Sequence, residues 1–89
     1  MATVRFTANI QRHVSCPTRQ VAGATLGEVL DRYFQDNEQA RGYVLDDQSA
    51  LRRHITIFVD GQTIRDRAHL ADPVHESSRI YVFQALSGG

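Results

Sequence analysis

The sequence predicts an α+β fold: a mixed sheet of four or five strands with one helix packed across one face. Apolar and polar residues alternate near both ends of the chain, and a single stretch between them places its apolar residues at helical spacing. The resulting order is strand, strand, helix, strand, short strand, strand. A chain of 89 residues has room for one domain with one core.

The first strand is expected at residues 4–10, where four apolar side chains alternate with polar ones: Val4, Phe6, Ala8 and Ile10. A turn at residues 11–12 leads to a weaker strand at residues 13–21. Pro17 lies inside that second strand and removes one backbone donor, which indicates an edge strand or a bulge.

The helix is expected to begin at Thr25, which forms a capping box with Glu28. Its apolar stripe has the spacing of an amphipathic helix of roughly four turns that ends before Gly42; the stripe consists of Leu26, Val29, Leu30, Tyr33 and Phe34. Residues 42–53 show no clean period and are expected to form a loop.

The second half of the chain contains the most β-prone residues. A strand at 54–59 is followed by Asp60-Gly61, a strong signal for a tight turn, and by a short returning strand at 62–64. Asp72-Pro73 is expected to start another turn, and the final strand is expected at 79–86.

Strand alternation assigns side chains to the two faces of the sheet. The helix is expected to cover one face, which carries Val4, Phe6, Ile55, Ile57, Val59, Ile80 and Val82. Phe58, Tyr81 and Phe83 then project from the other face as an apolar patch, which indicates a docking surface for a protein partner. The alternative is that residues 42–53 fold over these aromatic side chains and bury them.

The composition favours a small soluble domain in the cytoplasm. Ten basic residues balance ten acidic ones, so the charge gives no indication of binding to nucleic acid or to an anionic membrane. No apolar run approaches the roughly 20 residues that span a bilayer, and the N-terminal residues do not resemble a signal peptide. The single cysteine, Cys16, has no partner for an internal disulfide, which suits a reducing compartment.

The sequence offers no catalytic or metal-binding set of its own. The four histidines do not fall at metal-ligand spacings, and Cys16 is expected to be a half-buried apolar residue. The chain has no lysine and no phosphate-binding loop, so it is not expected to bind ATP by itself.

The final strand runs directly into Ser87-Gly88-Gly89. Two glycines there add nothing to stability, but they give a slender backbone beside the terminal carboxylate. With this ending, the element order, the Val59-Asp60-Gly61 hairpin and the turn region at Asp72-Pro73-Val74, the chain resembles the ubiquitin-like β-grasp sulfur carriers of the ThiS/MoaD type over essentially its whole length. Residues 51–59 are most similar to carriers that serve a cysteine-synthase-type enzyme, with the small subunit of molybdopterin synthase a close second.

The resemblance implies a β-grasp sulfur-carrier domain at 1–89 with a flexible tail at 85–89. It also implies that the chain is not an enzyme and binds no cofactor. A partner related to ubiquitin-activating enzymes would use ATP to adenylate Gly89, and a persulfide protein would supply the sulfur of a C-terminal thiocarboxylate. An acceptor synthase would then take that sulfur for cysteine, molybdopterin or thiamin. Gly88 would give access to the carboxylate, and a partner groove would hold Ala85, Leu86 and Ser87.

Two other functions fit the same residues. A ubiquitin-like modifier would be joined to lysines of other proteins through Gly89, although without lysines of its own it could not form chains through them. A β-grasp interaction module would use the sheet face alone, and its terminus would be inert.

Overall fold

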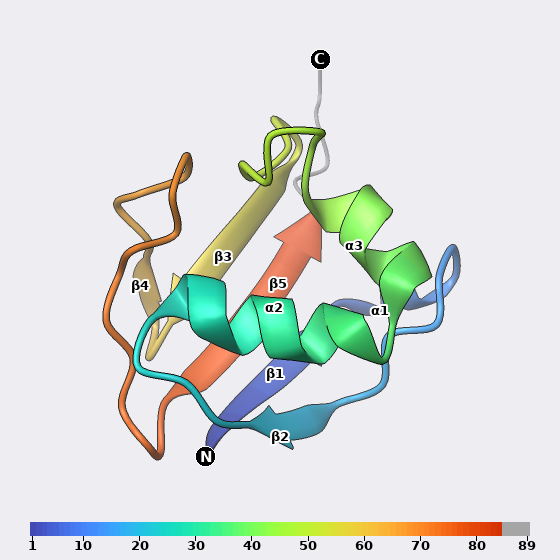
Figure 1. Ribbon diagram of the computed structural model, residues 1–89. Coiled ribbons are helices and arrows are strands. Elements are labelled where there is room, and N and C mark those ends of the chain that lie inside the picture. The colour runs from blue at the N-terminus through green and yellow to red at the C-terminus, as the bar shows by residue number, and fades with distance from the viewer. Residues whose placement is uncertain (85–89) are drawn as a thin grey trace.

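The computed structural model of the protein describes residues 1–84. These residues form one mixed sheet with helices packed against it (Figure 1). In chain order the elements are β1 (Ala2–Phe6), α1 (Ala8–Gln11), β2 (Arg19–Val21), α2 (Leu26–Gln35), α3 (Glu38–Val44), β3 (Ile55–Val59), β4 (Gln62–Thr63) and β5 (Arg79–Gln84).

The sheet has the strand order β2-β1-β5-β3-β4. The central strand, β5, is parallel to its neighbour β1, although the two lie at opposite ends of the chain, and the other pairs are antiparallel. Figure 1 shows α2 lying across one face of this sheet. The α+β fold with a mixed five-stranded sheet is therefore confirmed.

The core lies between α2 and the sheet. The five apolar residues predicted for the stripe of α2 are all buried, and so are the predicted inward-facing residues of β1, β3 and β5, apart from the half-buried Val59. The predicted cap of α2 is also present. The backbone N–H of Glu28 donates to Thr25 Oγ1 at 3.3 Å, and the Thr25 hydroxyl donates to Glu28 Oε2 at 3.4 Å.

The prediction of a strand through residue 10 is wrong beyond Phe6. The chain turns into α1 at Ala8, where Gln11 N–H donates to the Thr7 carbonyl at 3.1 Å. Ile10 is still fully buried, so its apolar character reflects packing of a helix rather than of a strand. The second strand is also shorter than expected, because it forms only at Arg19–Val21, after Pro17.

The expectation of one long helix followed by a loop is wrong at residues 36–44. Helix α2 ends at Gln35. The side-chain amide of Asn37 donates to the backbone carbonyl of Tyr33 at 3.1 Å and so satisfies an acceptor at the helix end. A new helix, α3, runs from Glu38 to Val44 and contains Gly42. Its buried residues, Ala40 and Val44, lie four positions apart on one face, and this spacing packs α3 against the core.

The turn between β3 and β4 is confirmed. Asp60 has a φ of 52° and Gly61 a φ of 84°, the pair of positive angles that a tight two-residue hairpin requires. The turn expected at Asp72-Pro73 is wrong. Pro73 forms a bridge to Thr25, and the turn before β5 falls at residues 76–77.

Among residues 1–84, no helix combines the length and the apolar character needed to cross a membrane.

Candidate functional site

Five of the predicted site residues lie outside the described residues: Ala85, Leu86, Ser87, Gly88 and Gly89. The other three, Phe58, Tyr81 and Phe83, lie on β3 and β5, and β5 is the strand that leads to the tail. The described part of the candidate site therefore lies on β3 and β5.

The three predicted aromatic residues form one cluster on the sheet. Phe58 pairs with Tyr81 across β3 and β5, and the Phe58 and Phe83 rings lie edge to face with centroids 5.0 Å apart. Tyr81 and Phe83 are stacked with centroids 6.0 Å apart. Phe58 and Phe83 are half-buried, while Tyr81 is 38% exposed and is one of two large apolar residues with so much free surface among the described residues. The cluster thus presents aromatic surface to solvent, as the alternation of the strands predicted.

The alternative in which residues 42–53 bury this cluster is wrong. Val44, Leu45 and Leu51 belong to the core, and α3 packs against α2. Because the apolar side chains of this segment are directed into the core, Tyr81 remains exposed.

An arginine that the sequence interpretation missed completes this face. The Arg5 guanidinium lies over the Tyr81 ring, 5.8 Å from its centroid, in cation–π geometry. Arg5, Phe58, Tyr81 and Arg79 border a mainly apolar hollow of about 340 Å³. Neither arginine forms an ion pair with a carboxylate in the described part of the chain. The alternation of the first strand indicates that Arg5 points away from the core. To place Arg5 beside Tyr81, however, one must know that β1 pairs with β5, and the sequence does not show this.

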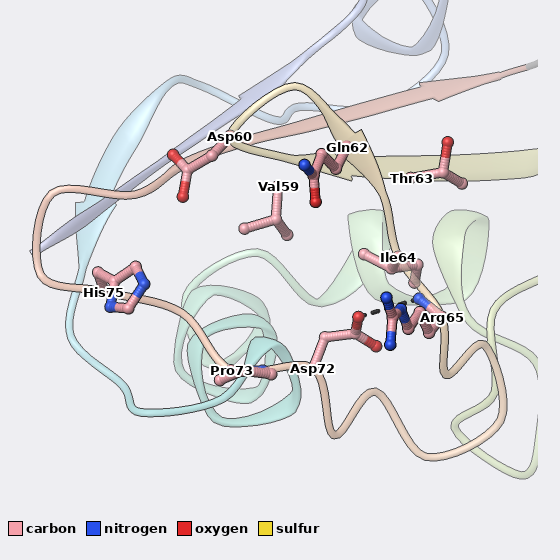
Figure 2. Close-up of a pocket in the computed structure, with 9 residues that line it drawn as sticks. All are labelled: Val59, Asp60, Gln62, Thr63, Ile64, Arg65, Asp72, Pro73 and His75. Carbon is pink, nitrogen blue, oxygen red and sulfur yellow. Dashed lines mark hydrogen bonds between the residues drawn. The ribbon is translucent and has the colours of Figure 1, made fainter.

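A second hollow, of about 410 Å³, lies beside the β3–β4 hairpin (Figure 2). The two aspartates of the loop that forms its wall, Asp66 and Asp72, accept hydrogen bonds from backbone groups of that loop. Asp72 accepts the backbone N–H groups of Arg65 and Asp66 at 2.9 and 2.8 Å. Asp66 accepts three more, of which that of His69 is the main cause of its lowered pKa. These groups stabilise the loop and are not free to act as an acid–base pair.

Cys16 does not have the environment of a reactive thiol. It is 3% exposed, more deeply buried than the half-buried position expected, and this burial raises the pKa of its thiol. Among residues 1–84, no three histidine, cysteine, aspartate or glutamate side chains form a group that could hold a metal ion.

Comparisons with known proteins agree with this geometry. The model of the ThiS family matches residues 4–89. No curated protein matches the chain.

Solved structures show the same fold. The chain is similar to SAMP1 from Haloferax volcanii, with 21% identity, a TM-score of 0.81 and coverage of 99% of this chain and 98% of that chain. It is similar to a chain of the Amycolatopsis orientalis BexX/CysO complex, with 20% identity, a TM-score of 0.83 and full coverage of both chains, each 100%. It is also similar to Mycobacterium tuberculosis CysO, with 20% identity, a TM-score of 0.80 and coverage of 97% and 100%.

These likenesses show the β-grasp, ubiquitin-like fold. The family match supports the carrier function at a general level, in which the protein is a cosubstrate of other enzymes rather than a catalyst. The match covers almost the whole sequence, so the chain belongs to the ThiS family of ubiquitin-like sulfur carriers.

Proposed function

We propose that this chain carries sulfur as a thiocarboxylate on the terminal carboxylate of Gly89. The observation that supports this best is the ThiS family match, which runs to residue 89 and so includes Gly88-Gly89. The exposed aromatic face on β5, the strand that precedes the tail, agrees with a protein that works through partners.

In the proposed chemistry, a carboxylate oxygen of Gly89 attacks the α-phosphorus of ATP and releases pyrophosphate. The resulting acyl-adenylate has AMP as its leaving group, which makes the carbonyl carbon reactive. The terminal sulfur of a persulfide on a donor protein then displaces AMP and forms an acyl disulfide. A thiol reductant cleaves the sulfur–sulfur bond, and this step leaves the thiocarboxylate on Gly89.

The ATP site belongs to a partner enzyme related to ubiquitin-activating enzymes. The chain has no lysine and no phosphate-binding loop, so it lacks the groups that usually hold a triphosphate. The partner docks on Phe58, Tyr81 and Phe83, and a groove of the partner holds Ala85, Leu86 and Ser87. A cytoplasmic location supplies the ATP and the reducing conditions that this chemistry needs.

The acceptor is a synthase of a cysteine, molybdopterin or thiamin type pathway, and in the molybdopterin case the chain is the small subunit of the synthase. A second candidate function is conjugation to target proteins through Gly89. Conjugation is favoured by the fold likeness to proteins described as small archaeal modifier protein 1. It would proceed through the same acyl-adenylate of Gly89 as sulfur transfer. The two functions differ in the nucleophile that displaces AMP, a persulfide or a lysine amine.

The test is ATP–pyrophosphate exchange in an extract of the cells that produce the protein, with purified carrier added at increasing concentrations. Wild-type carrier is expected to stimulate exchange, and a variant without Gly88 and Gly89 is expected not to.

Tyr81→Ser is expected to raise the half-saturating carrier concentration about tenfold with little change in maximal rate, since it removes docking surface. Gln39→Ala, at an exposed position of α3, is the matched control. A lack of stimulation by wild-type carrier above the exchange of the extract alone, or stimulation without the diglycine, would contradict the proposal.

A further inference from the structure

Gln84, the last described residue of β5, is held by side chains from two helices. Its Oε1 accepts a hydrogen bond from the Tyr43 hydroxyl of α3 at 2.8 Å and another from Asn9 Nδ2 of α1 at 3.0 Å. The donors lie 41 and 75 residues away in the sequence. One oxygen therefore joins the end of the central strand to two separate elements.

These side-chain contacts lie where β5 loses one of its neighbouring strands. On the β1 side, pairing ends at Phe6 and Val82, and the last backbone hydrogen bond runs from Thr7 N–H to the Val82 carbonyl at 3.1 Å. On the β3 side, pairing continues to Ile55 and Gln84. Beyond Val82 the strand thus has a neighbouring strand on one side only, and Asn9 and Tyr43 supply the contacts on Gln84 that β1 no longer provides.

The two donors are themselves held in place. The Tyr43 ring stacks on the His13 ring, with centroids 5.6 Å apart and an angle of 16° between the planes, and it packs against the core. Asn9 is half-buried and precedes the fully buried Ile10 in α1. Donors with restricted positions hold their acceptor more firmly than mobile surface side chains would.

We propose that Asn9, Tyr43 and Gln84 form a tail-root clamp, which fixes the end of β5 and so the direction from which the chain continues to Gly89. This inference rests on the proposed function. The carboxylate of Gly89 must reach the phosphorus of a bound nucleotide in a partner, and a fixed starting point for the tail limits the volume that this carboxylate has to search. Asn9 and Tyr43 are positioning residues that act through Gln84, since their hydrogen bonds are made to the side chain of Gln84.

The test compares Gln84→Met with Gln84→Glu. Methionine has a similar length but cannot accept the two hydrogen bonds as an amide oxygen does, whereas glutamate keeps an acceptor oxygen. In the full chain labelled with nitrogen-15, Gln84→Met is expected to lower the backbone order parameter at residue 84. In the exchange assay it is expected to lower the maximal rate by at least about threefold to tenfold, the range that corresponds to one of the two lost hydrogen bonds. The half-saturating concentration is expected to change by less than about twofold, because the docking face is intact.

Tyr43→Phe and Tyr33→Phe supply a matched pair. Both remove a single tyrosine hydroxyl that donates a hydrogen bond, but the Tyr33 hydroxyl donates to the Pro17 carbonyl at 2.7 Å, outside the clamp. Tyr43→Phe is expected to lower both readouts as Gln84→Met does, but by less, because the hydrogen bond from Asn9 remains. Tyr33→Phe is expected to lower thermal stability while it leaves the maximal exchange rate and the order at residue 84 unchanged.

Three results would overturn the clamp: unchanged order at residue 84 in Gln84→Met, failure of Gln84→Glu to restore that order and the maximal rate, or an equal loss of rate in Tyr33→Phe. Failure of the proposed function is a different result. It would appear as an absence of any increase in exchange with wild-type carrier, and the order parameters, measured on the isolated protein, would still decide whether the clamp exists.

Discussion

Asp60 shows how one residue stabilises a turn through both its backbone and its side chain. Its positive φ of 52° places it in the hairpin between β3 and β4. Its carboxylate accepts the Arg79 backbone N–H at 2.8 Å and the hydroxyl of the buried Ser78 at 2.9 Å. These hydrogen bonds lower the pKa of Asp60, and the one from the Arg79 backbone has the largest effect. The carboxylate therefore ties the hairpin to the start of β5.

Replacement of Asp60 by asparagine is expected to destabilise the protein in a pH-dependent way. The folded-state pKa of Asp60 lies below its unfolded value, so its stabilising contribution is complete above the unfolded pKa and is lost as the pH falls through the folded one. Urea unfolding should show Asp60→Asn less stable than wild type at neutral pH, with the difference shrinking below about pH 4. Asparagine tolerates positive φ, so the turn itself is preserved. A difference that stays constant with pH would contradict this role for the carboxylate.

At the scale of single elements, two glycines with open surroundings are expected to respond oppositely to alanine. Apart from the adjacent residues and the backbone of the helix itself, no heavy atom lies within 4 Å of a Cβ added at Gly42 or at Gly61. Gly42 lies in helix α3, where alanine is favoured, so Gly42→Ala is expected to stabilise the protein by about 0.5 to 1 kcal/mol. Gly61 has a φ of 84°, so Gly61→Ala is expected to destabilise it by about 1 kcal/mol or more. Denaturant midpoints of the two variants test this, and a shift in the same direction for both would refute it.

The elements that the sequence predicted well are those with a strong local signal. The capping box and stripe of α2 and the Asp60-Gly61 turn need only neighbouring residues to be recognised. Helix α1 did not have such a signal, because the spacing of Ala8 and Ile10 continues the alternation of the first strand. Helix α3 was missed because it is short and contains Gly42. Its stability comes from burial of Ala40 and Val44, which depends on α2 and the sheet being in place.

For the molecule as a whole, the candidate site depends on β5. This strand contributes Tyr81 and Phe83 to the aromatic face and ends in Gln84, next to the tail. The aromatic cluster could be predicted from alternation in β3 and β5. The contributions of Arg5, Asn9 and Tyr43 could not, because they require the parallel pairing of β1 with β5 and the placement of α1 and α3, contacts between residues far apart in the sequence.

The most direct test of the central claim is the intact mass of the protein purified gently from the cells that make it, with fragmentation of its C-terminal peptide. The account predicts a population heavier by the replacement of one oxygen with sulfur, located on Gly89 and absent from Met1 and Cys16. A free carboxylate on Gly89 in every preparation, even after incubation with cell extract, ATP and a persulfide source, would contradict the carrier function. Conjugates of higher mass joined through Gly89 would instead support the modifier.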